Sequence, residues 1–229
     1  MSEYSKIYDE ATEIYVSRNC FKRIAVYSPQ MKKGDSPVDF AVEYLKDRLV
    51  PDDIVIMSAT AVSIAQGRYE NVKDIKVSKF ASFVTRRMGK LSSPGRLEIP
   101  ELMETVYSCC GPVRFFFAWI IGKIGAKIGD KELFFRVAGH DTQYLRYVNA
   151  GEDEGRLIVY KPQKADVIAM RTSEKLGARV MIALVNTGKK HIIAGSEKLL
   201  DRDELEEILA GRPAKLNNTD MPFCLIRAV

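Results

Sequence analysis

The stretch PDDIVIMSATAVSIAQGRY, residues 51–69, decides the fold class of this chain. Its apolar part, residues 52–58, is a short continuous run of the kind that forms a strand buried inside a sheet. A second such run, ARVMIALV, occupies residues 178–185. Small polar residues follow both runs, at residues 58–68 and 185–190. Because ligands of open α/β sheets bind beyond the carboxyl ends of the strands, these two strand ends are candidates for one shared crevice.

Helical signals alternate with the strand-like runs. Ser36 and Pro37 are a favourable N-cap and first helical residue for one helix. Gly177 is a C-terminal stop for a second helix, and Asp201 is an N-cap for a third. Further β-rich runs occupy residues 22–29, 155–162 and 222–229. This alternation predicts an α/β or α+β fold with mixed sheets and flanking helices.

Composition narrows the classes of protein to which the chain could belong. The 229 residues are 46% hydrophobic and 28% charged, the balance of an ordinary globular protein. The net charge of +5 suits an anionic ligand such as a nucleotide and is too small to predict a nucleic-acid binder. None of the four cysteines forms a CxxC pair, so reduced thiols in a cytoplasmic protein are expected. The first 17 residues carry acids throughout and predict no signal peptide.

We expect a single domain over residues 1–229, with two lobes joined near residues 86–130 as the alternative. Residues 86–96, RRMGKLSSPGR, combine Gly, Pro, Ser and basic residues, as is typical of a mobile loop. The most apolar run, FFFAWII at residues 115–121, is far shorter than the about 20 residues that span a bilayer. It predicts a buried helix, and a contact surface for another subunit or for a membrane surface is the alternative.

The stretch YVNAGEDEGRLIVYKP, residues 147–162, contains three consecutive acids, Glu152, Asp153 and Glu154. They follow a small-residue turn and precede a β-rich run. Carboxylate oxygens are ligands that Mg²⁺ and Mn²⁺ prefer, but an ordinary solvated turn has the same composition. A metal site here therefore needs a second group of ligands elsewhere in the chain.

Six blocks of the sequence occur together in a characteristic order. They are YSPQMKKGDSPVDF, PDDIVIMSATAVSIAQGRY, VNAGEDEG, YKPQKADVIAMRTSEKLGA, VMIALVNTGKK and DRDELEEILAGRPAKLNNTDMPFCLIR. No single block is specific, but their order and spacing from about residue 25 to residue 227 are. In this respect the chain resembles the coenzyme F-420 gamma-glutamyl ligases, as a divergent member of that superfamily.

The resemblance implies a gamma-glutamyl-ligase-like fold, an interwoven homodimer and an activity. The activity is GTP- and divalent-metal-dependent formation of an amide bond between L-glutamate and a small acidic substrate, with Mn²⁺ or Mg²⁺ as the metal. Metal ligation in the family corresponds here to Asp153, Asn186 and Thr187. Nucleotide contacts correspond to Ser58, Ala59, Ser63, Arg68 and Lys189.

The chain departs from the family pattern at three positions. Two family lysines that contact phosphate correspond to Thr60 and Ile64, which carry no charge. A family aspartate corresponds to Asn186, which offers a carbonyl oxygen without negative charge. Three hypotheses follow: an active ligase, a nucleotide- or metal-binding relative that has lost turnover, and an interaction protein that uses residues 115–121.

Overall fold

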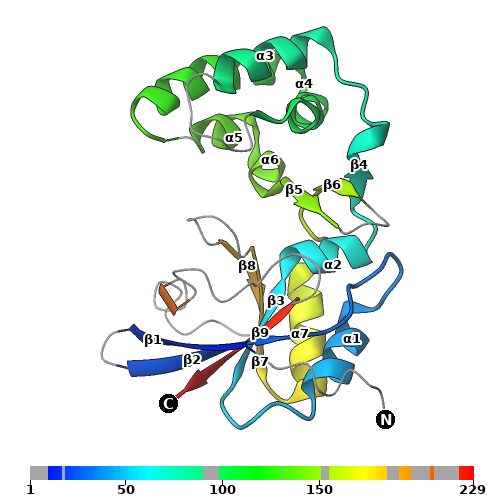
Figure 1. Ribbon diagram of the computed structural model, residues 1–229, viewed down its shortest axis with the longest axis vertical. Helices are drawn as coiled ribbons and strands as arrows, with labels where there is room; N and C mark the ends of the chain where they lie inside the picture. Colours follow the sequence, from blue (N-terminus) through cyan, green and yellow to red (C-terminus); the bar gives the residue numbers. More distant parts are fainter. Residues whose placement is uncertain are drawn as a thin grey trace. The chain divides into compact units, whose positions relative to one another are not determined.

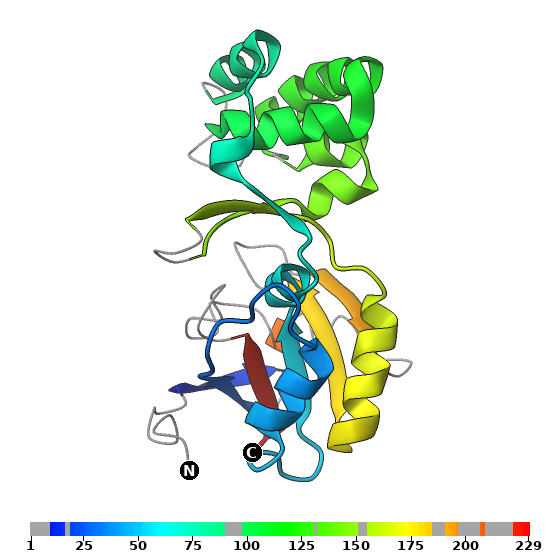
Figure 2. The same cartoon turned by 90° about the vertical axis from the view of Figure 1, so that its right-hand side faces the viewer.

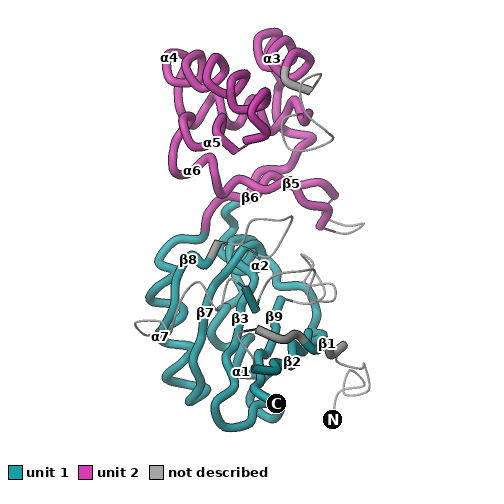
Figure 3. The backbone as a smooth tube through the Cα atoms, turned by 90° about the vertical axis from the view of Figure 1, so that its left-hand side faces the viewer, with its two compact units in different colours: residues 1–68, 162–229 teal, residues 69–161 magenta. Residues whose placement is uncertain are grey.

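The computed structural model describes residues 10–16, 19–89, 98–130, 132–150, 155–184, 191–196, 207–208 and 222–229. The chain divides into two compact units (Figure 3). Unit 1 contains residues 1–68 and 162–229, and unit 2 contains residues 69–161. The segment 86–130 lies inside unit 2. The expectation of a single domain over residues 1–229 stays a prediction.

Unit 1 is built on a six-stranded mixed sheet (Figure 1). In spatial order its strands are β1 (Glu10–Val16), β2 (Asn19–Val26), β9 (Phe223–Ala228), β3 (Ile54–Ser58), β7 (Arg179–Leu184) and β8 (His191–Gly195). Among the described strands of this sheet, β3 and β7 form the one parallel pair, and the other neighbours are antiparallel. All five residues of β3 are buried, as expected for a strand in the middle of a sheet with both faces covered. The predicted strands at 52–58, 178–185 and 222–229 are therefore confirmed.

Three helices accompany this sheet: α1 (Pro37–Leu45), α2 (Ala59–Ala65) and α7 (Ala165–Leu176). The Ser36 hydroxyl accepts a hydrogen bond from the Asp39 amide at 3.3 Å, so the predicted N-cap is confirmed. Gly177 ends α7 in the left-handed conformation with φ 65°, which confirms the predicted stop. Helices α1 and α7 pack side by side, and α7 also packs against β7 and β8 (Figure 2). The third predicted helix, which begins at Asp201, lies outside the described residues except for 207–208.

An ion pair stabilises the end of the sheet where β3 begins. The side chain of Asp53 is fully buried, and its two oxygens accept hydrogen bonds at 2.8 Å from Nε and Nη2 of Arg227 in β9. The Val50 amide donates to the same carboxylate at 3.0 Å. The hydrogen bond to Asp53 raises the pKa of the Arg227 guanidinium above its ordinary value. This contact connects two chain segments that are 174 residues apart.

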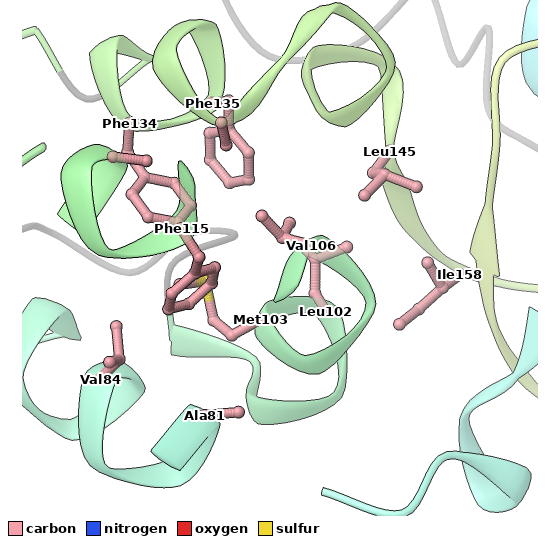
Figure 4. Close-up of a cluster of buried hydrophobic side chains, with 12 residues drawn as sticks. Ala81, Val84, Leu102, Met103, Val106, Phe115, Phe134, Phe135, Leu145 and Ile158 are labelled. Atoms are coloured by element: carbon pink, nitrogen blue, oxygen red, sulfur yellow. The ribbon is translucent and has the colours of Figure 1, made fainter. Parts of the chain in front are cut away.

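Unit 2 combines a small antiparallel sheet with helices. Its strands in spatial order are β4 (Tyr69–Asn71), β6 (Arg156–Val159) and β5 (Arg146–Asn149). Its helices are the 3₁₀ helix η2 (Val72–Asp74), α3 (Lys79–Gly89), α4 (Pro100–Lys127), α5 (Leu133–Ala138) and α6 (His140–Tyr144). The buried cluster of Figure 4 forms its core. At its centre Phe115 contacts Phe134 edge to face, with ring centroids 5.7 Å apart. The predicted α/β or α+β fold class with flanking helices is confirmed, and the sheet of unit 1 is mixed whereas that of unit 2 is antiparallel.

Helix α4 is interrupted in its middle. Gly111 has φ 74° and ψ 167°, outside the helical region, and Pro112 restarts the helix at a position where proline is favoured. By length and composition alone, α4 is the one helix in the described part of the chain that could cross a membrane. The break at Gly111 divides it into two shorter helices, each less than the length that a bilayer requires.

The predicted buried helix over residues 115–121 is a helix, but only one of its faces is buried. Phe115 and Ala118 are buried, whereas Phe116, Phe117 and Ile120 are exposed. The face with Phe115 and Ala118 packs into the core of unit 2, so the predicted burial holds for that face alone. The predicted mobile loop at 86–96 begins inside α3, which continues to Gly89, and the remainder from residue 90 lies outside the described residues.

Candidate functional site

The carboxyl ends of β3 and β7 meet at one edge of the sheet in unit 1. Ile54 pairs with Arg179 and Ser58 pairs with Ala183, in parallel register. The chain therefore leaves β3 at Ser58 and β7 at Leu184 from neighbouring positions. The predicted adjacency of the two strand ends is confirmed. This is the edge at which open α/β sheets bind ligands.

Helix α2 begins directly at the end of β3. The Ser58 hydroxyl accepts a hydrogen bond from the Ala61 amide at 3.4 Å, so Ser58 is the N-cap of α2. The Ser58 amide donates to the Pro222 carbonyl at 2.7 Å, just before β9. Ala59 is fully buried. The fold itself therefore uses the Ser58 amide, whereas the family resemblance had implied only a nucleotide contact for Ser58.

The polar residues of α2 face the interior of the unit. Ser63 is fully buried, and its hydroxyl oxygen has no hydrogen-bond partner among the described residues. A buried hydroxyl without a partner is unfavourable, so this atom is one that a bound ligand could satisfy. Thr60 and Ile64, at the positions of the two family lysines, are also buried. Because both positions are buried, a lysine at either one would have to place its ammonium group inside the core or extend its side chain through the core to reach solvent.

A loop with two lysines lies against the other end of α2. The Gly34 amide donates to the Ala65 carbonyl at 2.8 Å. Gly67 has φ 67°, and a Cβ atom at Gly67 would lie 2.8 Å from Cε of Lys33. The left-handed backbone conformation therefore favours glycine at this turn, and the exposed side chain of Lys33 lies against it. The next residue, Arg68, is half-buried, and its amide donates to the Ser63 carbonyl at 2.9 Å.

The structure thus brings the KKGD block and the QGR block of the sequence together. Lys33 supplies a cation near Gly67 and Arg68, which the sequence alone could not establish because more than 30 residues separate the two blocks. The side chain of Gln66 makes two further hydrogen bonds, both of 2.8 Å, to the backbone of Gln163. Nothing in the sequence pattern indicated the Gln66–Gln163 contact.

The remaining predicted site residues are Asp153, Asn186, Thr187 and Lys189, and all four lie outside the described residues. Within the part of the chain that the structure describes, no group of three His, Cys, Asp or Glu side chains could hold a metal ion. The donors predicted for the metal are carboxylate, amide carbonyl and hydroxyl oxygens. Oxygen donors of this kind fit Mg²⁺ or Mn²⁺ better than a softer transition metal.

A cleft of about 480 Å³ lies in unit 2, lined in part by Glu70, Asp74 and Glu104. Glu70 accepts a hydrogen bond from the Tyr160 hydroxyl at 2.7 Å, and Glu104 accepts one from the Ser78 amide at 2.9 Å. None of the predicted site residues lines this cleft. The cleft is therefore not the predicted nucleotide site, and two of its acids already bond to unit 2 itself.

The fold is that of an α/β protein in which the ends of β3 and β7 meet at one sheet edge, the place where open α/β sheets bind ligands. The family model described as F420-0:gamma-glutamyl ligase matches residues 25–186, well over half of the chain. The chain belongs to the F420-0:gamma-glutamyl ligase family. The match begins in β2 and ends two residues beyond β7, so the sixth block, residues 201–227, lies outside it. No curated protein matches the sequence. Membership of the family supports a ligase-like function that acts on small molecules.

Proposed function

We propose that this chain is a GTP- and divalent-metal-dependent ligase that joins L-glutamate to a small acidic substrate through an amide bond. The single observation that supports the proposal best is the family match over residues 25–186, which includes both strand ends of the candidate site. In this reaction a substrate carboxylate oxygen takes the γ-phosphoryl group of GTP, and GDP leaves. The glutamate amine then attacks the acyl carbon and releases phosphate, and the amine gives up a proton.

Residues of α2 and its flanking loops would bind the nucleotide in this proposal. Arg68, Lys33 and Lys189 would supply positive charge to the phosphate oxygens, and the Ser63 hydroxyl would donate a hydrogen bond. Asp153, Asn186 and Thr187 would hold Mg²⁺ or Mn²⁺ through oxygen ligands. When bound, the metal would neutralise the negative charge that develops on the transferred phosphoryl group. We further propose that the protein acts in the cytoplasm as a homodimer.

One observation favours a second function, a relative that binds nucleotide or metal without turnover. Thr60 and Ile64 are buried and uncharged at the positions of the family lysines. A site with fewer cations neutralises less of the charge on a phosphoryl group, and this would slow transfer before it abolished binding. Fold and family alone do not establish turnover, so the two functions need separate measurements.

Thermal unfolding with nucleotide and metal tests binding. GTP at about 100 times its dissociation constant adds about 2.7 kcal/mol to the free energy of unfolding. For a chain of this size that corresponds to an increase in Tm of roughly 5–11 °C. We expect the increase with GTP and Mn²⁺ or Mg²⁺, and its loss in Asp153→Ala. Glu174→Ala removes an exposed acid of α7 and should keep the increase. The same measurement with ATP in place of GTP shows whether the protein prefers the guanine or the adenine nucleotide.

Phosphate release then distinguishes the two functions. A ligase releases phosphate from GTP when L-glutamate and an acidic acceptor, first F420-0, are both present. A relative without turnover shows the increase in Tm but no release. Absence of any shift with either nucleotide and either metal would exclude both functions.

A further inference from the structure

The second half of α4 exposes an apolar face to solvent. Six residues spaced at helical intervals form this face, five in the helix and one at its C-cap: Val113, Phe116, Phe117, Ile120, Ile124 and Ile128. Phe117 is 56% exposed, and Val113 and Ile128 are 70% and 73% exposed. The opposite face packs into the core of unit 2 through Phe115 and Ala118. A surface helix of a globular protein normally has polar residues on the side that faces water, whereas this helix has apolar residues there.

Aromatic rings from α3 extend this face into one continuous surface. Phe83 of α3 lies 6.2 Å from Trp119, and Phe116 lies 5.9 Å from Trp119, measured between ring centroids. Phe116 in turn contacts Phe117 at 6.2 Å. Together with the six residues above, Phe80, Phe83 and Trp119 form what we call the apolar patch. Contiguous exposed apolar surface of this kind marks an interaction site.

Positive charge accompanies the apolar patch. Helix α3 and the segment 112–127 of α4 contain six basic residues and no acid: Lys79, Arg86, Arg87, Arg114, Lys123 and Lys127. Arg87 lies 5.4 Å from the ring centroid of Phe83, and Lys123 lies 3.8 Å from that of Trp119. The first acid beyond α4 is Asp130, which forms an ion pair with Arg136 of α5. Helix α3 and this second half of α4 therefore carry only positive charge, whereas the acids of α4, Glu101 and Glu104, lie in its first half.

We propose that the apolar patch binds the surface of an anionic lipid bilayer. Aromatic and aliphatic side chains between basic residues are the composition of helices that lie in the membrane interface. Tryptophan favours the headgroup region, and lysine and arginine near a membrane surface are attracted by anionic lipids. The segment lies on the membrane and does not cross it, because one face of the helix is already buried in unit 2.

Charge complementarity selects the bilayer over a second copy of this chain. In a two-fold symmetric dimer the same patch lies on both subunits. Two copies of this patch would bring the basic residues of α3 and α4 close to each other, which is unfavourable for association. An anionic surface instead neutralises these cations, and the acyl region accepts the apolar side chains.

Vesicle binding by the full chain tests the proposal, and Trp119 provides the signal. It is the only tryptophan of the chain, so its fluorescence reports on the patch alone. We expect the protein to sediment with vesicles of equal parts phosphatidylglycerol and phosphatidylcholine, and much less with phosphatidylcholine alone. Brominated acyl chains should quench Trp119 in the mixed vesicles. High salt should weaken binding, because salt screens the attraction of the basic residues to the lipids.

Variants with matched controls identify the patch as the contact. Phe117→Asp and Ile124→Asp should each weaken partitioning at least tenfold, because a charge replaces an apolar contact. Met170→Asp, which changes an exposed apolar residue of α7, should not. Removing two cations with Arg86→Gln and Arg87→Gln should weaken partitioning about 25-fold, at about fivefold for each basic residue. Arg171→Gln is the matched control in α7.

Three results would overturn the proposal. One is a folded wild type that does not partition into the anionic vesicles. Another is equal loss of binding in the patch variants and their controls. The third is a dimer in sedimentation that Phe117→Asp dissociates while vesicle binding is absent, which would identify the patch as a contact between copies. Because these assays contain no nucleotide, their failure leaves the proposed ligase function unaffected.

Discussion

Removal of the Arg227 side chain is the most direct test of what holds the sheet of unit 1 together. In Arg227→Met, the fully buried Asp53 carboxylate loses both guanidinium bonds of 2.8 Å and keeps only the Val50 amide among the partners described above. Breaking a buried ion pair by removing one partner costs about 3–5 kcal/mol. The side chain of Arg227 is 29% exposed, so water reaches part of the pair and we expect the lower end of this range, about 3 kcal/mol.

For a protein of this size, a loss of about 3 kcal/mol lowers the Tm by roughly 6–12 °C. Differential scanning calorimetry of wild type and Arg227→Met measures this directly. Arg171→Met, which changes an exposed arginine of α7, should stay within about 0.5 kcal/mol of wild type. Asp53→Asn completes a double-mutant cycle in which the losses should be strongly non-additive. A Tm of Arg227→Met equal to that of Arg171→Met, or additive losses in the cycle, would refute the reasoning.

Two further predictions concern buried side chains. Phe115→Ala should destabilise unit 2 by about 3–5 kcal/mol in urea unfolding, whereas Phe117→Ala, two residues away on the exposed face, should change stability by less than about 1 kcal/mol. Burial raises the pKa of the Cys224 thiol from 9.0 to about 12, so the folded state keeps this proton above pH 9 while the unfolded state releases it. The contribution of this proton to the free energy of unfolding is therefore complete below pH 9 and is lost as the pH rises towards 12. Relative to Cys224→Ala, the wild type should lose about 1 kcal/mol of stability between pH 9 and 10. A difference in stability between the two proteins that does not change over this interval would contradict the assignment.

Local signals in the sequence determined the elements and the family. The cap at Ser36, the stop at Gly177 and the apolar run before Ser58 each depend on neighbouring residues and were predicted correctly. The order of the blocks also indicated the family that the match over residues 25–186 confirms. Four of the predicted site residues, from Asp153 to Lys189, remain predictions because they lie outside the described residues.

Tertiary structure decided the features that depend on residues far apart in the chain. Strand β9, from the end of the sequence, pairs between β2 and β3, and it brings Arg227 to Asp53 and Pro222 to the Ser58 amide. The continuous apolar run at residues 115–121 predicted a buried helix, but not that Phe116 and Phe117 would stay exposed. A helical period shows which side chains share a face, while burial of that face depends on whether another part of the chain packs against it. The sequence alone therefore determined the elements and the family, and packing decided which apolar surface of this protein remained exposed.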